Sequence, residues 1–123
     1  MTVRFEIRAG EWSSGPVEVA RSRRDRRHGL RDARRSSGLA LTARSVHTFG
    51  MHRPISVIAC DRNGRVLRAE RLRPRRVFFA PGAALIIETF EPGLPKVGAT
   101  VEVSLRKNGQ RATGNRQQST GNR

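Results

Sequence analysis

The segment VHTFGMHRPISVIACDRNGRVLRAERL, residues 46–72, carries the clearest structural signals in the chain. Within it, Ile55–Cys60 is an apolar run interrupted by a single serine, too short for a helix and of the right length for a strand buried on both faces. Asn63-Gly64 follows, a dipeptide that readily adopts the positive φ angles of a tight hairpin turn. Val66–Leu72 mixes apolar and charged residues, as a return strand with one exposed face does. The segment therefore predicts a β-hairpin at the centre of the fold.

Strand-like runs recur on both sides of this hairpin, separated by glycine and proline turns. Val3–Arg8 alternates apolar and charged residues, which is the period of a half-buried strand, and Ala84–Phe90 is a second strongly apolar strand. Further strands are predicted at residues 17–20, 38–42, 45–49, 77–79 and 100–105. This pattern favours a mainly β fold, an antiparallel β-sandwich or flattened barrel, over an α/β fold.

One short α-helix is predicted at about residues 22–35. Ser22 and Asp25 have the spacing of a capping box, in which each side chain binds a free amide of the first turn. Arg34 and Arg35 lie in the last turn, where cations interact favourably with the helix dipole. The apolar stripe of this helix is thin, so we expect it to dock lightly on a sheet.

The 123 residues fit one domain and a tail. We assign residues 1–105 to a single β-rich domain. Residues 106–123 contain no acidic and almost no apolar side chain, so burial cannot offset the entropy cost of ordering them. They are predicted to form a disordered, basic tail.

The formal net charge is +15, and of the 25 cationic side chains all but Lys96 and Lys107 are arginine. Such a charge favours polyanionic partners. The strong preference for arginine also has a second explanation, the codon usage of a GC-rich bacterial genome, because lysine would serve almost equally well in a non-specific phosphate contact. We prefer the codon-usage interpretation and keep the functional one open.

Cys60 is the single cysteine, which excludes an intramolecular disulfide. The N-terminal residues lack an apolar run of signal-peptide length, and no stretch is long and apolar enough to span a bilayer. We therefore expect a cytoplasmic protein without a membrane partner.

Several short motifs occur in a fixed order along the chain. They are His28-Gly29-Leu30, Gly38-Leu39-Ala40-Leu41, Thr48-Phe49-Gly50-Met51, the strand Ile55–Asp61 with Gly64 and Val66 after it, Leu85–Glu88 and Val97–Val101. Over about residues 17–104, this series resembles the bacterial and archaeal family known as domain of unknown function 192. The resemblance implies a jelly-roll-like β-sandwich with one helix, and it implies no reaction.

The chain departs from that family at the start of its central strand. Family members usually carry an aspartate at this place, where the present sequence has Ser56. Any role of a carboxylate there is therefore absent or altered.

The main functional hypothesis is a non-catalytic domain that binds a small molecule or a protein. The turn from His47 to Arg53 and the neighbouring strand ends concentrate the side chains that folding alone explains least. The candidate ligand-binding residues are His47, Thr48, Met51, His52, Arg53, Asp61 and Glu88. For Glu88, at the end of an apolar strand, the alternatives are a buried carboxyl with a raised pKa and an ion pair with an arginine. We prefer the ion pair.

Histidine and aspartate are also metal ligands, but the spacing here does not support a metal site. The chain has no His-X-His, no second cysteine and no His-Glu-X-X-His motif. We expect no metal and no cofactor.

A second hypothesis is a module that binds RNA or DNA through basic side chains. Its candidate residues are arginines in or next to the predicted helix and in the loop after residue 72, namely Arg21, Arg23, Arg24, Arg27, Arg31, Arg34, Arg35, Arg75 and Arg76, together with the tail.

A third hypothesis, which we rank last, is a hydrolase. It requires Ser56 or Cys60 as nucleophile with His47 as base, and these side chains must lie within hydrogen-bond reach of each other. Because Cys60 lies inside an apolar strand, we expect an inert, packed thiol, and we expect no catalytic residues.

Overall fold

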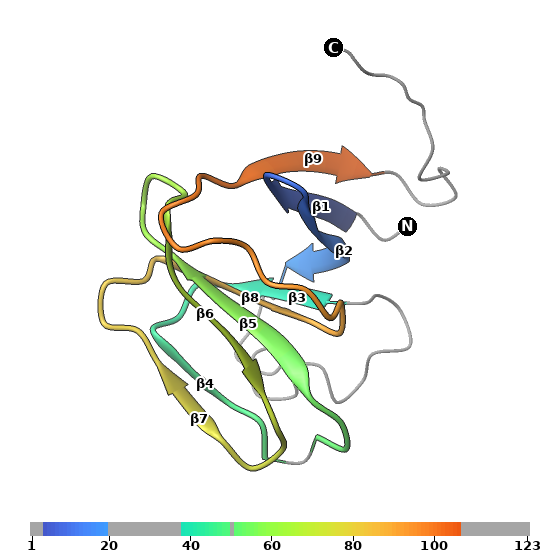
Figure 1. The fold of residues 1–123 in the computed structure, drawn as a ribbon, viewed down its shortest axis with the longest axis vertical. Coiled ribbons are helices and arrows are strands. Elements are labelled where there is room, and N and C mark those ends of the chain that lie inside the picture. Colours follow the sequence, from blue (N-terminus) through green and yellow to red (C-terminus); the bar gives the residue numbers. More distant parts are fainter. Residues whose placement is uncertain (1–3, 20–37, 50, 107–123) are drawn as a thin grey trace.

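The computed structural model describes residues 4–19, 38–49 and 51–106. The predicted helix at 22–35, its arginines and residues 107–123 of the predicted tail lie outside these ranges. The described residues form nine strands (Figure 1): β1 (Arg4–Ala9), β2 (Trp12–Val19), β3 (Gly38–Leu41), β4 (Ser45–His47), β5 (Ile55–Cys60), β6 (Val66–Leu72), β7 (Val77–Phe79), β8 (Leu85–Thr89) and β9 (Glu102–Arg106). The predicted mainly β class is confirmed.

Seven strands form one sheet in the order β6-β5-β8-β3-β2-β1-β9, and β4 pairs with β7 in a separate two-stranded sheet. The prediction of a purely antiparallel arrangement is wrong, because β2 and β3 run parallel while the other pairs are antiparallel. Parallel neighbours need a connection of about a dozen residues or more. Residues 20–37, which join β2 to β3, provide that length.

The sheets are open, so the alternative of a flattened barrel is also wrong. Among the described residues, one isolated antiparallel bridge, Arg65↔Thr100, links the residue before edge strand β6 to the segment that leads into edge strand β9. Backbone bonds from Val66 N–H to the Ala99 carbonyl (2.8 Å) and from Val101 N–H to the Gly64 carbonyl (2.8 Å) extend this contact. The contact is local, and β6 and β9 do not pair along their length.

The central hairpin predicted around Ile55–Leu72 is confirmed. β5 and β6 pair from Ile55↔Leu72 to Cys60↔Val66, and every residue of β5 is buried. The turn is longer than the Asn-Gly dipeptide alone, and Gly64 takes the positive φ angle of 82°.

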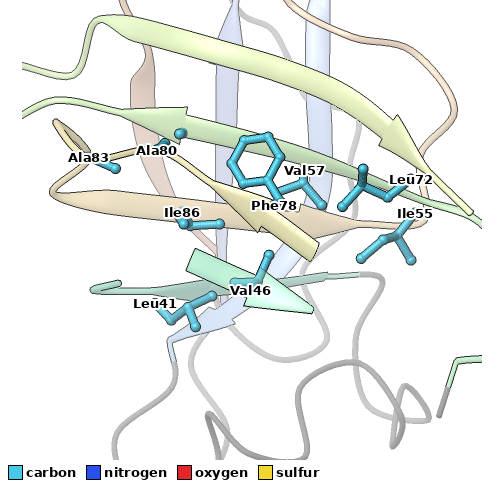
Figure 2. Close-up of a cluster of buried hydrophobic side chains, with 10 residues drawn as sticks. Leu41, Val46, Ile55, Val57, Leu72, Phe78, Ala80, Ala83 and Ile86 are labelled. Atoms are coloured by element: carbon cyan, nitrogen blue, oxygen red, sulfur yellow. The ribbon is translucent and has the colours of Figure 1, made fainter. Parts of the chain in front are cut away.

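Both faces of β5 are covered, and alternate residues enter two apolar clusters. Ile55 and Val57 belong to the first cluster, which the β4–β7 sheet helps to form through Val46 and Phe78 (Figure 2). Ile58 and Cys60 belong to the second cluster, on the other face of the large sheet. The small sheet therefore packs over one face of the large one.

Within the described residues, no helix combines the length and the hydrophobicity that crossing a membrane requires.

Candidate functional site

The β4–β7 sheet has one buried side and one exposed side. Val46 and Phe78 are buried in the first cluster. On the opposite side the register places His47 beside Val77 and Ser45 beside Phe79. Val77 is 65% exposed and Phe79 57% exposed. Two apolar side chains thus face solvent from a two-stranded sheet, which core packing does not explain.

Phe49 extends this exposed side beyond the end of β4. Its ring centroid lies 5.2 Å from that of His47, and its backbone N–H donates a hydrogen bond to His47 Nδ1 (3.3 Å). The Phe49 side chain is 50% exposed. We refer to the exposed side chains of His47, Phe49, Val77 and Phe79, on the outer side of the β4–β7 sheet, as the hairpin face. This name refers to the β4–β7 sheet and not to the central β5–β6 hairpin.

Thr48, between His47 and Phe49, anchors a neighbouring loop. Its side chain is fully buried; Oγ1 donates to the Arg73 carbonyl (2.7 Å) and accepts from the Arg76 N–H (2.7 Å). The Thr48 N–H donates to the Arg76 carbonyl (2.8 Å). The Thr48 hydroxyl is therefore engaged inside the fold, where it holds the arginine-rich loop of residues 73–76 against the end of the hairpin face.

Arginines border the hairpin face at both ends. At the Phe79 end, the Arg44 carbonyl accepts a bond from the Ala80 N–H (2.7 Å). At the other end, Arg75 has a φ of 66°, the one positive value at a non-glycine residue in the described ranges. Its N–H donates to the Thr48 carbonyl (3.3 Å), which holds this uncommon conformation in place.

Four exposed arginines make up this border: Arg44, Arg73, Arg75 and Arg76. Among the ion pairs formed by described residues, none involves any of the four. By contrast, Arg68 on β6 bonds Glu70 through Nε (2.6 Å) and the Phe79 carbonyl through Nη1 (2.6 Å). Arg68 therefore fastens β7 to the large sheet, whereas the four border arginines leave their charge available to a partner.

The remaining residues of the predicted turn, Met51, His52 and Arg53, do not belong to the hairpin face. Met51 is partly buried and packs against the first cluster. His52 and Arg53 are exposed, and the Arg53 guanidinium carbon lies 3.8 Å from the centroid of the Phe90 ring, which is cation–π geometry.

Asp61 is not brought together with this turn. It follows the other end of β5, a strand of six residues, and so lies roughly 20 Å along the strand direction from Arg53. Its Oδ1 accepts from the N–H groups of Asn63 (2.9 Å) and Arg65 (3.0 Å). This arrangement is an Asx-type turn that shapes the β5–β6 connection.

Glu88 is buried in the sheet, with 5% of its surface exposed. It lies opposite Leu39 of β3 and Val57 of β5. The preferred ion pair is not found, because no described residue forms an ion pair or hydrogen bond with its carboxyl group. Burial raises the pKa of Glu88 from 4.5 to about 7.

The residues of the hydrolase hypothesis lie on different sides of the large sheet. Cys60 is fully buried in the second cluster, and burial, followed by the charge of Asp61, raises its pKa to about 11. Ser56 Oγ donates to the Glu91 carbonyl (2.8 Å) and accepts from Arg71 Nη1 (2.9 Å). His47 belongs to the small sheet that covers the opposite face, so it does not meet either nucleophile.

No group of three or more histidine, cysteine, aspartate or glutamate side chains within the described ranges is arranged to hold a metal ion.

Of the residues in the hairpin face and its border, the sequence predicted His47, Arg75 and Arg76 and missed Arg44, Phe49, Val77 and Phe79. The run Val77-Phe78-Phe79 predicts a short strand, and only its pairing with Ser45–His47 shows that the outer two side chains face solvent. Pairing between strands about 30 residues apart leaves no local signal in the sequence.

No protein-family model and no curated protein matches the chain. Two solved structures share its fold. One is a protein of unknown function from Novosphingobium aromaticivorans DSM 12444, with a TM-score of 0.63, 15% sequence identity, and coverage of 80% of this chain and 83% of that one. The other is a proposed transcription regulator from Sinorhizobium meliloti 1021, with a TM-score of 0.64, 15% identity, and coverage of 84% and 94%. At this identity the similarity shows the fold alone.

Proposed function

We propose that the chain is a non-catalytic binding domain that holds nucleic acid on the hairpin face and its bordering arginines. The observation that carries the proposal is the combination of exposed Phe49, Val77 and Phe79 with four arginines that form no ion pair among the described residues. Arginine matches phosphate geometry through paired N–H donors, and aromatic rings offer a surface for bases.

The proposal joins the two main hypotheses drawn from the sequence. The first centred on the turn at His47, and the second used basic side chains that include Arg75 and Arg76. The β4–β7 register and the bonds of Thr48 to the 73–76 loop bring the backbone of these residues to the same end of the small sheet. A binding turn and a basic loop therefore become parts of a single proposed site.

We also propose kinship with domain of unknown function 192. The mainly β fold is consistent with it, and the kinship would supply no activity. In this chain the hydroxyl of Ser56, where that family usually has aspartate, is hydrogen-bonded to Arg71 and to the Glu91 carbonyl.

The test is binding of a fluorescein-labelled 20-nucleotide DNA, single-stranded and as a duplex, to the full chain between 25 and 200 mM salt. The double variant R75E/R76E should weaken binding at least tenfold at low salt and make the log–log salt dependence shallower by about 1.5, because two phosphate contacts are lost.

The matched control is R62E/R65E, which changes the charge equally with two exposed arginines of the β5–β6 turn. Equal loss in both variants would show that net charge alone governs binding and would overturn the proposed site. Absence of binding by the unaltered chain at 25 mM salt would overturn the proposed function.

A further inference from the structure

We infer that the hairpin face selects single-stranded nucleic acid, with unpaired bases stacked on Phe49 and Phe79. This inference rests on the proposed function and specifies its ligand class. In a duplex the flat faces of the bases are stacked on one another, so protein rings cannot reach them unless the strands open.

The geometry of the face supports stacking. Phe49 and Phe79 are half exposed or more and lie toward opposite ends of the face, with Val77 and His47 between them. Alternate residues of a strand stand about 7 Å apart on the same side of a sheet, so the face spans about two or three bases. Stacking on aromatic side chains accepts any base, because every base has a π-face.

The charges fit a strand that crosses the face from end to end. Arg44 lies beside the Phe79 end, and Arg75 and Arg76 lie beside the Phe49 end. Phosphates that flank the stacked bases would therefore meet guanidinium groups on either side.

A second copy of this chain is a poorer occupant of the same surface. Two hairpin faces brought together would oppose, on each side, four arginines that form no ion pair with a described residue, and juxtaposed like charges disfavour association. An acidic partner without bases would use the arginines and leave the two rings without a role.

The test is the double variant F49L/F79L, which keeps the exposed apolar character and removes the rings. Affinities of the full chain and the variant are compared for labelled 12-nucleotide dT and rU strands, for a 12-base-pair duplex and for heparin, a polyanion without bases. The variant should lose about 25-fold or more in affinity for both single strands, because each ring contributes about fivefold or more and the two contributions multiply. Affinity for heparin should stay within about twofold.

The matched control is V97A/V103A, which removes two other exposed apolar side chains and should leave all affinities unchanged. A direct readout is F79W, whose added indole fluorescence should be quenched by dT or rU and not by heparin. Circular dichroism confirms that each variant folds.

The outcomes separate the two proposals. Two results would overturn the stacking inference and leave the proposed function standing. One is salt-dependent binding whose affinity for single strands is the same in F49L/F79L as in the unaltered chain. The other is equal affinity for the single strands and the duplex. Ring-dependent binding of heparin would indicate an acidic partner without bases and would also overturn the inference. Absence of any binding at low salt removes the proposed function and the inference with it.

Discussion

Glu88 places a carboxyl group in the apolar interior without a cation beside it among the described residues. Between the ordinary pKa of 4.5 and the raised pKa of about 7, the unfolded chain has lost this proton while the folded chain keeps it. The contribution of this group to the free energy of unfolding is therefore fully present below pH 4.5 and is lost as the pH rises to about 7. A difference of this size corresponds to about 3 kcal/mol.

We predict that Glu88→Gln removes this loss. The variant should match the unaltered chain near pH 4.5 and exceed its free energy of unfolding by up to about 3 kcal/mol at pH 8, measured by urea unfolding. Glu102→Gln, on an exposed part of β9, is the control. A pH-dependent gain of equal size in the control would contradict the assignment to burial.

Cys60 illustrates a titratable side chain that burial makes inert. With a pKa of about 11 and no exposed surface, its thiolate fraction at pH 8 is on the order of one in a thousand. We predict that an aromatic disulfide reagent modifies it at least about 100-fold more slowly in the native chain than in urea. Rapid modification without denaturant would refute the burial of the strand that carries it.

At the scale of elements, the parallel pairing of β2 and β3 depends on a close approach at Gly38. A Cβ atom there would lie 2.6 Å from the Glu88 carbonyl oxygen and 2.8 Å from Val17 Cγ1. Because neighbouring backbone would have to move, we predict that Gly38→Ala lowers the free energy of unfolding by about 1–3 kcal/mol in thermal or urea unfolding.

Gly82→Ala is the control for that substitution. Its added Cβ would meet only Leu67 Cδ1 at 3.4 Å, an ordinary contact. If Gly38→Ala left the free energy of unfolding unchanged, or if Gly82→Ala lowered it equally, then β2, β3 and β8 would not be packed as closely as described.

The two adjacent phenylalanines of β7 differ in role, because one is packed in the core and the other lies on the surface. Phe78 is fully buried under the Arg68 guanidinium, whereas Phe79 is 57% exposed. We predict that Phe78→Ala costs about 3–5 kcal/mol of unfolding free energy and that Phe79→Ala changes it by no more than about 0.5 kcal/mol. A large loss for Phe79→Ala would give that ring a structural role and would weaken the case for a binding face.

At the scale of the whole molecule, local patterns predicted where strands form and how the central hairpin pairs, but not how the other strands pair. Ile55–Cys60 could be recognised because an apolar run of that length, interrupted only by Ser56, has few alternatives to a central strand. The parallel contact of β2 with β3 and the separate β4–β7 sheet depend on contacts between residues distant in sequence, which short-range periodicity does not encode.

The same limit explains the candidate site. His47 and Arg76 each stood out by residue type, but their proximity arises from the β4–β7 register and from the bonds that Thr48 makes to the 73–76 loop. Asp61 was predicted as a ligand because a carboxylate after an apolar strand fits a site and a turn equally well. Its hydrogen bonds to Asn63 and Arg65 assign it to the turn.

The proposal that this fold presents nucleic acid on its small sheet can be tested by amide chemical-shift mapping of the full ¹⁵N-labelled chain with a 12-nucleotide dT strand. We expect the largest shifts at residues 44–49 and 75–80, with Phe49, Val77 and Phe79 saturating together. Shifts confined to residues outside these two segments, with the amides of β4 and β7 unmoved at saturation, would contradict the proposal.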